Sequence, residues 1–133
     1  LRQAMEQRAA PQGTAGGSAD LASALNDCAS RMGWSPAQRG AAAHYLLKAG
    51  LLSRIVVRQG ARWGAAMERF APFGARMLPA EGEPDDHARA MIAAGARANG
   101  VPIDRDDDVA VVLDYIAASR EVDLAKQAFA AAP

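Results

Sequence analysis

The sequence predicts a mainly α-helical fold, in which a three-helix core with a small β-hairpin precedes two C-terminal helices. Three observations support this prediction. Helix-forming residues dominate, with 33 alanines among 133 residues and an aromatic content of only 5%. Apolar residues recur at three- and four-residue steps, the spacing that places them on one face of a helix. Glycine and proline separate these stretches, as they do at the ends of helices.

The N-terminal part of the chain predicts two helices. Residues 1–10 predict a short helix, followed by a glycine-bearing loop over residues 12–17. Ser18 or Asp20 is expected to cap the second helix, which runs to Met32. The apolar residues that we expect this helix to bury are Leu21, Ala24, Leu25, Cys28, Ala29 and Met32.

The third helix begins with the clearest local signal in the chain. Ser35 as N-cap, Pro36 at the first helical position and Gln38 three residues after the cap form a capping box. The helix is expected to run to about Lys48 and to stop at Gly50.

The residues after Gly50 change in composition, and they predict a β-hairpin. Residues 51–58 are rich in β-branched side chains and predict a strand. Residues 59–62 contain Gly60 and predict the turn, and residues 63–67 predict the return strand.

The rest of the chain predicts an irregular connection and two helices. Residues 69–84 contain three prolines and two glycines and predict the connection. The helices are expected over residues 85–99 and 106–129. The sequence thus predicts a basic domain over residues 1–68, the connection, and an acidic helical segment over residues 85–133.

The net charge of zero conceals an asymmetry along the chain. Residues 1–65 hold eight basic and three acidic side chains, a net charge of +5, and residues 66–133 hold seven basic and twelve acidic ones, a net charge of −5. Between Asp27 and Glu68, six basic residues occur without an acidic one. This asymmetry indicates a half that binds a polyanion, although arginine also simply solvates an alanine-rich surface.

Residues 28–52 contain a helix, a glycine turn and a helix capped by Ser-Pro. They end in Ala-Gly-Leu-Leu at residues 49–52 and lead into the basic segment 54–58. In this order of elements, residues 18–68 resemble the winged helix-turn-helix DNA-binding family. The chain departs from the family pattern at Arg39, where an aliphatic residue is usual.

The resemblance implies that the protein binds DNA. The third helix would enter the major groove, and the hairpin would follow the phosphate backbone. The residues that the resemblance assigns to DNA are Gln38, His44, Tyr45 and Lys48 on the helix and Arg54, Arg58 and Arg62 on the hairpin. The expected partner is double-stranded DNA, in transcriptional or replicon control, and the C-terminal helices are expected to form a homodimer contact.

Other classes of site find little support in the sequence. The aspartates of residues 104–108 lack the glycine and glutamate of an EF-hand loop, so helix capping is the preferred interpretation. Cys28 and His44 lack the third orienting group of a nucleophilic site, and His87 has no second histidine or cysteine at metal-ligand spacing. We therefore expect no enzyme activity, no catalytic residue, no metal site and no cofactor.

Cysteine content and hydropathy favour a cytoplasmic protein. A single cysteine cannot form an internal disulfide. No run of about 18 apolar residues occurs, so we expect no membrane-spanning segment.

A second hypothesis belongs to a different class of function. The chain would be an all-helical adaptor or chaperone, in secretion or in phage or plasmid assembly, that binds another protein. Residues 54–67 distinguish the two hypotheses. A β-hairpin with outward-facing arginines favours DNA binding, and a continuation of the helix favours the adaptor.

Overall fold

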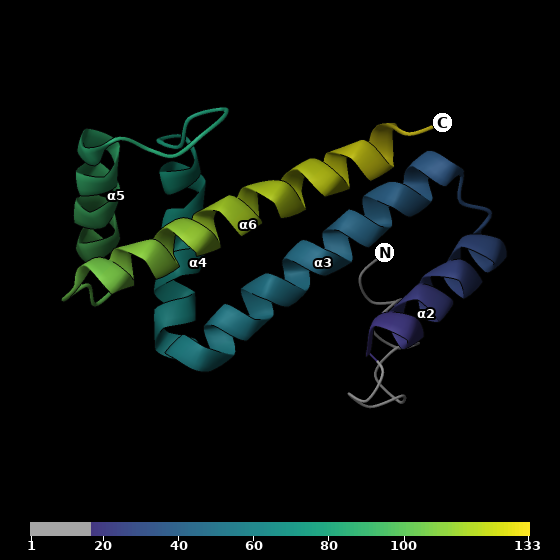
Figure 1. Ribbon diagram of the computed structural model, residues 1–133, viewed down its shortest axis with the longest axis horizontal. Coiled ribbons are helices and arrows are strands. Elements are labelled where there is room, and N and C mark those ends of the chain that lie inside the picture. The colour runs from purple at the N-terminus through teal and green to yellow at the C-terminus, as the bar shows by residue number, and fades with distance from the viewer. Residues whose placement is uncertain (1–16) are drawn as a thin grey trace. The chain divides into compact units, whose positions relative to one another are not determined.

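The computed structural model describes residues 17–133, which fold into helices joined by short connections (Figure 1). The helices are α2 (Gly17–Met32), α3 (Pro36–Gln59), α4 (Ala61–Ala75), α5 (Asp86–Ala98) and α6 (Asp106–Ala131). Within these described residues there is no strand, so the prediction of a mainly helical protein is confirmed. The helix expected over residues 1–10 lies outside them.

Contacts along the chain define two compact units. Among the described residues, one unit comprises residues 17–47 and 123–133, and the other comprises residues 48–122. The helices α3 and α6 each contribute residues to both units. Each unit has a hydrophobic core of its own.

The capping box predicted at the start of α3 is confirmed. The Ser35 hydroxyl accepts a hydrogen bond from the Gln38 backbone N–H at 3.1 Å, and the Gln38 side-chain oxygen accepts one from the Ser35 N–H at 3.0 Å. Two N–H groups that the first turn of a helix leaves unpaired thus gain acceptors.

The smaller core lies in the unit that contains α2. Its buried residues are Leu25, Cys28 and Ala42, and the partly buried Trp34, Leu46 and Phe129 pack against them. The rings of Trp34 and Phe129 meet edge to face, with centroids 5.1 Å apart, and add bulk where most apolar residues are alanines. The predicted buried face of α2 is wrong at both ends, because Leu21 is 43% and Met32 is 62% exposed.

The expected β-hairpin is wrong, and with it the winged-helix-like core. Residues 51–58 form the second half of α3, and residues 63–67 lie within α4. The buried Ile55 and the partly buried Leu51, Leu52 and Val56 pack against the core of residues 48–122. Residues one and four positions apart lie close together on one face of a helix. Packing of this face therefore overrides the strand propensity of the β-branched residues.

Gly60 separates α3 from α4. Its φ of 102° lies in a region that side-chain-bearing residues rarely adopt. Its N–H donates to the Val56 carbonyl at 2.8 Å, and its own carbonyl accepts from the Gly64 N–H at 3.0 Å. The chain therefore turns where the sequence predicts a hairpin turn, but the turn joins two helices.

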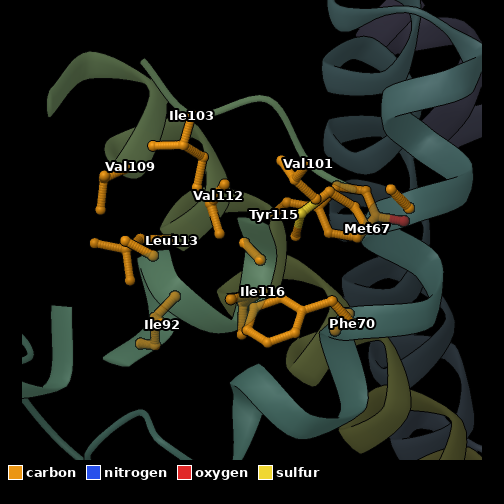
Figure 2. Packing of buried hydrophobic residues seen from close by; sticks show 14 of the residues in the cluster. Met67, Phe70, Ile92, Val101, Ile103, Val109, Val112, Leu113, Tyr115 and Ile116 are labelled. Atoms are coloured by element: carbon orange, nitrogen blue, oxygen red, sulfur yellow. The ribbon is translucent and has the colours of Figure 1, made fainter. Parts of the chain in front are cut away.

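The larger core is built from α4, α5 and α6, with Ile55 of α3 and part of the connection before α6 (Figure 2). The largest side chains that it buries completely are Phe70, Ile55, Met67, Ile92, Ile116, Val101 and Val112. In Figure 2 the Phe70 ring lies beside Ile116. α4 continues through Pro72 to Ala75, so the first part of the expected irregular connection is also helical.

Candidate functional site

The seven residues assigned to DNA by the resemblance fall into two groups. Gln38, His44 and Tyr45 belong to the unit of residues 17–47 and 123–133, whereas Lys48, Arg54, Arg58 and Arg62 belong to the unit of residues 48–122. The exposed ones are Arg54, Arg58 and Arg62, as the sequence predicts, and the half-buried ones are Gln38, His44 and Lys48. Exposure therefore supports a binding surface only for the three arginines of the second group.

Tyr45 and Gln38 have structural roles in the first group. Tyr45 is only 3% exposed, which corrects the expectation that it lies on the outer face of the helix. The Lys126 ammonium lies 5.9 Å from the centre of its ring, a cation–π contact. The side-chain oxygen of Gln38 already caps α3. We therefore place neither residue in the candidate site.

Arg54, Val57 and Arg58 form one exposed face of α3, which we call the cationic face. Steps of three and four residues bring side chains of a helix onto the same side. Val57 is 84% exposed, the highest value among the large hydrophobic side chains that the structure describes as exposed. The face thus combines two guanidinium groups with an accessible apolar group.

No carboxylate of the described residues forms an ion pair with Arg54, Arg58 or Arg62. The sequence explains this in part, because no acidic residue occurs between Asp27 and Glu68. Arg62 lies in the first turn of α4, directly after the turn at Gly60. These three guanidinium groups are therefore available to an anionic partner.

The two arginines of the cationic face differ in what they do for the helix. Arg58 lies in the last turn of α3, where a positive charge interacts favourably with the helix dipole. Arg54 lies one turn earlier, and a like-charged pair at this spacing costs a helix about 0.2–0.5 kcal/mol. Neither the helix dipole nor an ion pair within the described residues involves Arg54.

The acidic run at the start of α6 has a capping role, as the sequence predicts. Asp108 Oδ2 accepts hydrogen bonds from the backbone N–H groups of Asp104 at 2.9 Å and Arg105 at 3.0 Å. These bonds favour the charged carboxylate and lower the pKa of Asp108. Among residues 17–133, no three His, Cys, Asp or Glu side chains gather in an arrangement that could hold a metal ion.

Sequence reasoning missed Val57 because it assigned residues 51–58 to a strand. Alternation along a strand places residues 54 and 58 on one face and residue 57 on the other. A helical period continued through Gly50 places all three together. The signal that was available is the spacing of Leu51, Leu52 and Ile55 on the opposite side of the same helix.

Comparison with known proteins yields no match to a family model, a curated sequence or a solved structure. Within the described residues, no helix has the length and apolar character needed to cross a bilayer. The functional interpretation therefore depends on the chemistry of the cationic face.

Proposed function

We propose that this chain is a helical protein-interaction module, of the adaptor or chaperone type, whose cationic face binds an acidic and partly apolar segment of another protein. The observation that carries the proposal is Val57, 84% exposed and flanked by Arg54 and Arg58. The helical conformation of residues 54–67 also supports it, because a hairpin there was the feature that favoured DNA.

The chemistry of Val57 favours a protein partner over a phosphate backbone. Burying a valine side chain completely contributes about 1.5–3 kcal/mol, but only if the partner offers apolar surface. Phosphate contacts come from charged and hydrogen-bonding groups, to which a valine adds nothing. Single exposed apolar residues are common on proteins, but Val57 lies between two arginines that form no ion pair with a carboxylate of residues 17–133.

Duplex DNA is the second candidate partner. It is favoured by the three exposed guanidinium groups, which form no ion pair with a carboxylate of the described residues. This alternative needs no winged helix, because any exposed cationic surface attracts a polyanion. It predicts binding that falls steeply with salt and ignores Val57.

Fluorescence anisotropy with three labelled probes distinguishes these candidates. The first probe is an acidic amphipathic helical peptide with a leucine stripe, the second is polyglutamate of the same net charge, and the third is random duplex DNA. The variants are Arg54→Ala and Val57→Ser. Their matched controls are Arg39→Ala, which removes another exposed arginine of α3, and Met91→Ser, which removes a 49% exposed apolar residue of α5.

We expect the amphipathic peptide to bind more tightly than polyglutamate. Val57→Ser should weaken binding of the amphipathic peptide about fivefold, or about 1 kcal/mol. It should leave binding of polyglutamate unchanged, because the substitution removes apolar contact only. Arg54→Ala should weaken binding of both the peptide and polyglutamate, and the control variants should weaken binding of neither. Tight DNA binding that is insensitive to Val57→Ser would support the second candidate instead.

A further inference from the structure

A small hollow lies between α5 and the first turn of α6, and no residue of the cationic face lines it. Its volume is about 190 Å³, and its lining residues are Arg89, Ala90, Ala93, Arg97, Asp106 and Val109. Pockets for drug-sized ligands measure about 300–1,000 Å³, so this one suits a smaller molecule. Two of the six lining side chains are arginines, which is the first indication of an acidic ligand.

Arg97 lines the hollow and is exposed, and one hydrogen bond holds its side chain. Its Nε–H donates to the backbone carbonyl of Ile103 at 3.1 Å, and Ile103 is itself buried. A guanidinium group has five N–H donors, so four remain for a ligand. Because the bond to Ile103 already restricts the side chain, less conformational entropy is lost when Arg97 binds.

Arg89 lies eight residues before Arg97 on α5, and both line the hollow. With a rise of about 1.5 Å per residue, the two Cα atoms are about 12 Å apart. Arg89 is half-buried, and neither arginine forms an ion pair with Asp106 or with any other carboxylate that the structure describes. Ala93, which is 7% exposed, lies between them in sequence and adds no polar atom to the lining.

We infer that this hollow binds a small dicarboxylate. A guanidinium group pairs with a carboxylate through two parallel hydrogen bonds, so each arginine takes one end of a diacid. The two arginines reach the hollow from different turns of α5, so a ligand with two acid groups can engage both. Asp106 opposes the negative charge of such a ligand and limits its affinity.

The test is titration of the ¹⁵N-labelled chain with sodium succinate, followed by NMR. We expect saturable shifts in the amides of Ala90 and Ala93 and in the Nε–H of Arg97. Acetate and inorganic phosphate, titrated at the same ionic strength, should produce weaker and less localised changes. Equal shifts with phosphate would contradict a diacid site and identify a general anion site.

Variants test the assignment of each charge. Arg89→Gln and Arg97→Gln should each weaken succinate binding about tenfold, because each removes one charge-assisted pair. Asp106→Asn should strengthen it several-fold, because a like charge is removed. Arg76→Gln is the control, since this exposed arginine of the same unit neither lines the hollow nor belongs to the cationic face. No saturation with succinate, or an equal loss in Arg76→Gln, would overturn the proposal.

Discussion

Phe70 shows how closely single residues are matched in the larger core. Its ring is 1% exposed and contacts two glycines. A Cβ added at Gly95 would lie 2.6 Å from Phe70 Cε1, and one added at Gly74 would lie 2.9 Å from Phe70 Cε2. Glycine at both positions therefore makes the space that the ring occupies.

Replacement of Gly95 by alanine tests this fit. Overpacking a core typically costs about 1–3 kcal/mol, and alanine in place of helical glycine returns up to about 1 kcal/mol. We expect Gly95→Ala to destabilise the protein in urea unfolding. Gly50→Ala should stabilise it, because this helical glycine of α3 has nothing within 4 Å of the added Cβ. Equal effects of the two substitutions would contradict the packing of Phe70.

Burial of individual side chains was predictable only where the helical face was predictable. The periodicity of the two C-terminal helices predicts that Ile92, Val112, Met91 and Leu124 are buried. Ile92 and Val112 are completely buried, but Met91 is 49% and Leu124 is 48% exposed. Tyr45 and Met32 were misplaced, because the face that a helix buries depends on the neighbours that fold against it. Sequence spacing identifies which residues share a face of a helix. It does not identify which face the neighbouring helices cover.

At the scale of the element, the start of α6 illustrates how a local sequence specifies a helix end. Asp106, Asp107 and Asp108 all lie in its first turn, where negative charge is favourable. The Asp108 side chain also closes the turn by accepting hydrogen bonds from the backbone N–H groups of Asp104 and Arg105. The same device, with a glutamine, starts α3.

The Asp108 cap predicts a pH dependence of stability. Because the pKa of Asp108 is lower in the folded chain than its ordinary value of 3.8, the carboxylate stabilises the fold at neutral pH. This contribution is lost as the pH falls below that value and through the folded pKa. We expect Asp108→Asn to be less stable than the parent at pH 7. The difference in the free energy of unfolding should shrink below a pH of about 4.

Asp107→Asn is the matched control, because Asp107 is exposed in the same turn and caps no N–H group among the described residues. It should change stability less than Asp108→Asn at pH 7. Chemical denaturation at several pH values measures both variants. A stability difference for Asp108→Asn that is constant from pH 7 to 3 would contradict the capping role.

The helix ends that carry a clear sequence signal were predictable. The end of α3, which lacks such a signal, was not. The Ser-Pro cap placed the start of α3 correctly, and Asp85, whose side chain accepts from the Ala88 N–H, placed the start of α5. The end of α3 was misjudged because Gly50 resembles a helix stop. In the folded chain Gly50 lies within the helix, and the stop is Gly60, where φ is positive.

At the scale of the whole molecule, the charge asymmetry of the sequence does not become an asymmetry between the two units. The unit of residues 48–122 holds ten basic and eleven acidic residues, a net charge of −1. The cationic face and the acidic start of α6 belong to this same unit. Attraction of a partner is therefore a property of a local surface, which net charge along the sequence could suggest but not locate.

The central claim is that residues 51–58 continue α3 and so bring Arg54, Val57 and Arg58 onto one exposed face. The most direct measurement is the set of ¹³Cα chemical shifts and short-range proton contacts of residues 48–67 by NMR. We predict helical shifts with contacts between residues three apart, interrupted only at Gly60. Extended-type shifts over residues 51–58, with cross-strand contacts to residues 63–67, would contradict the account.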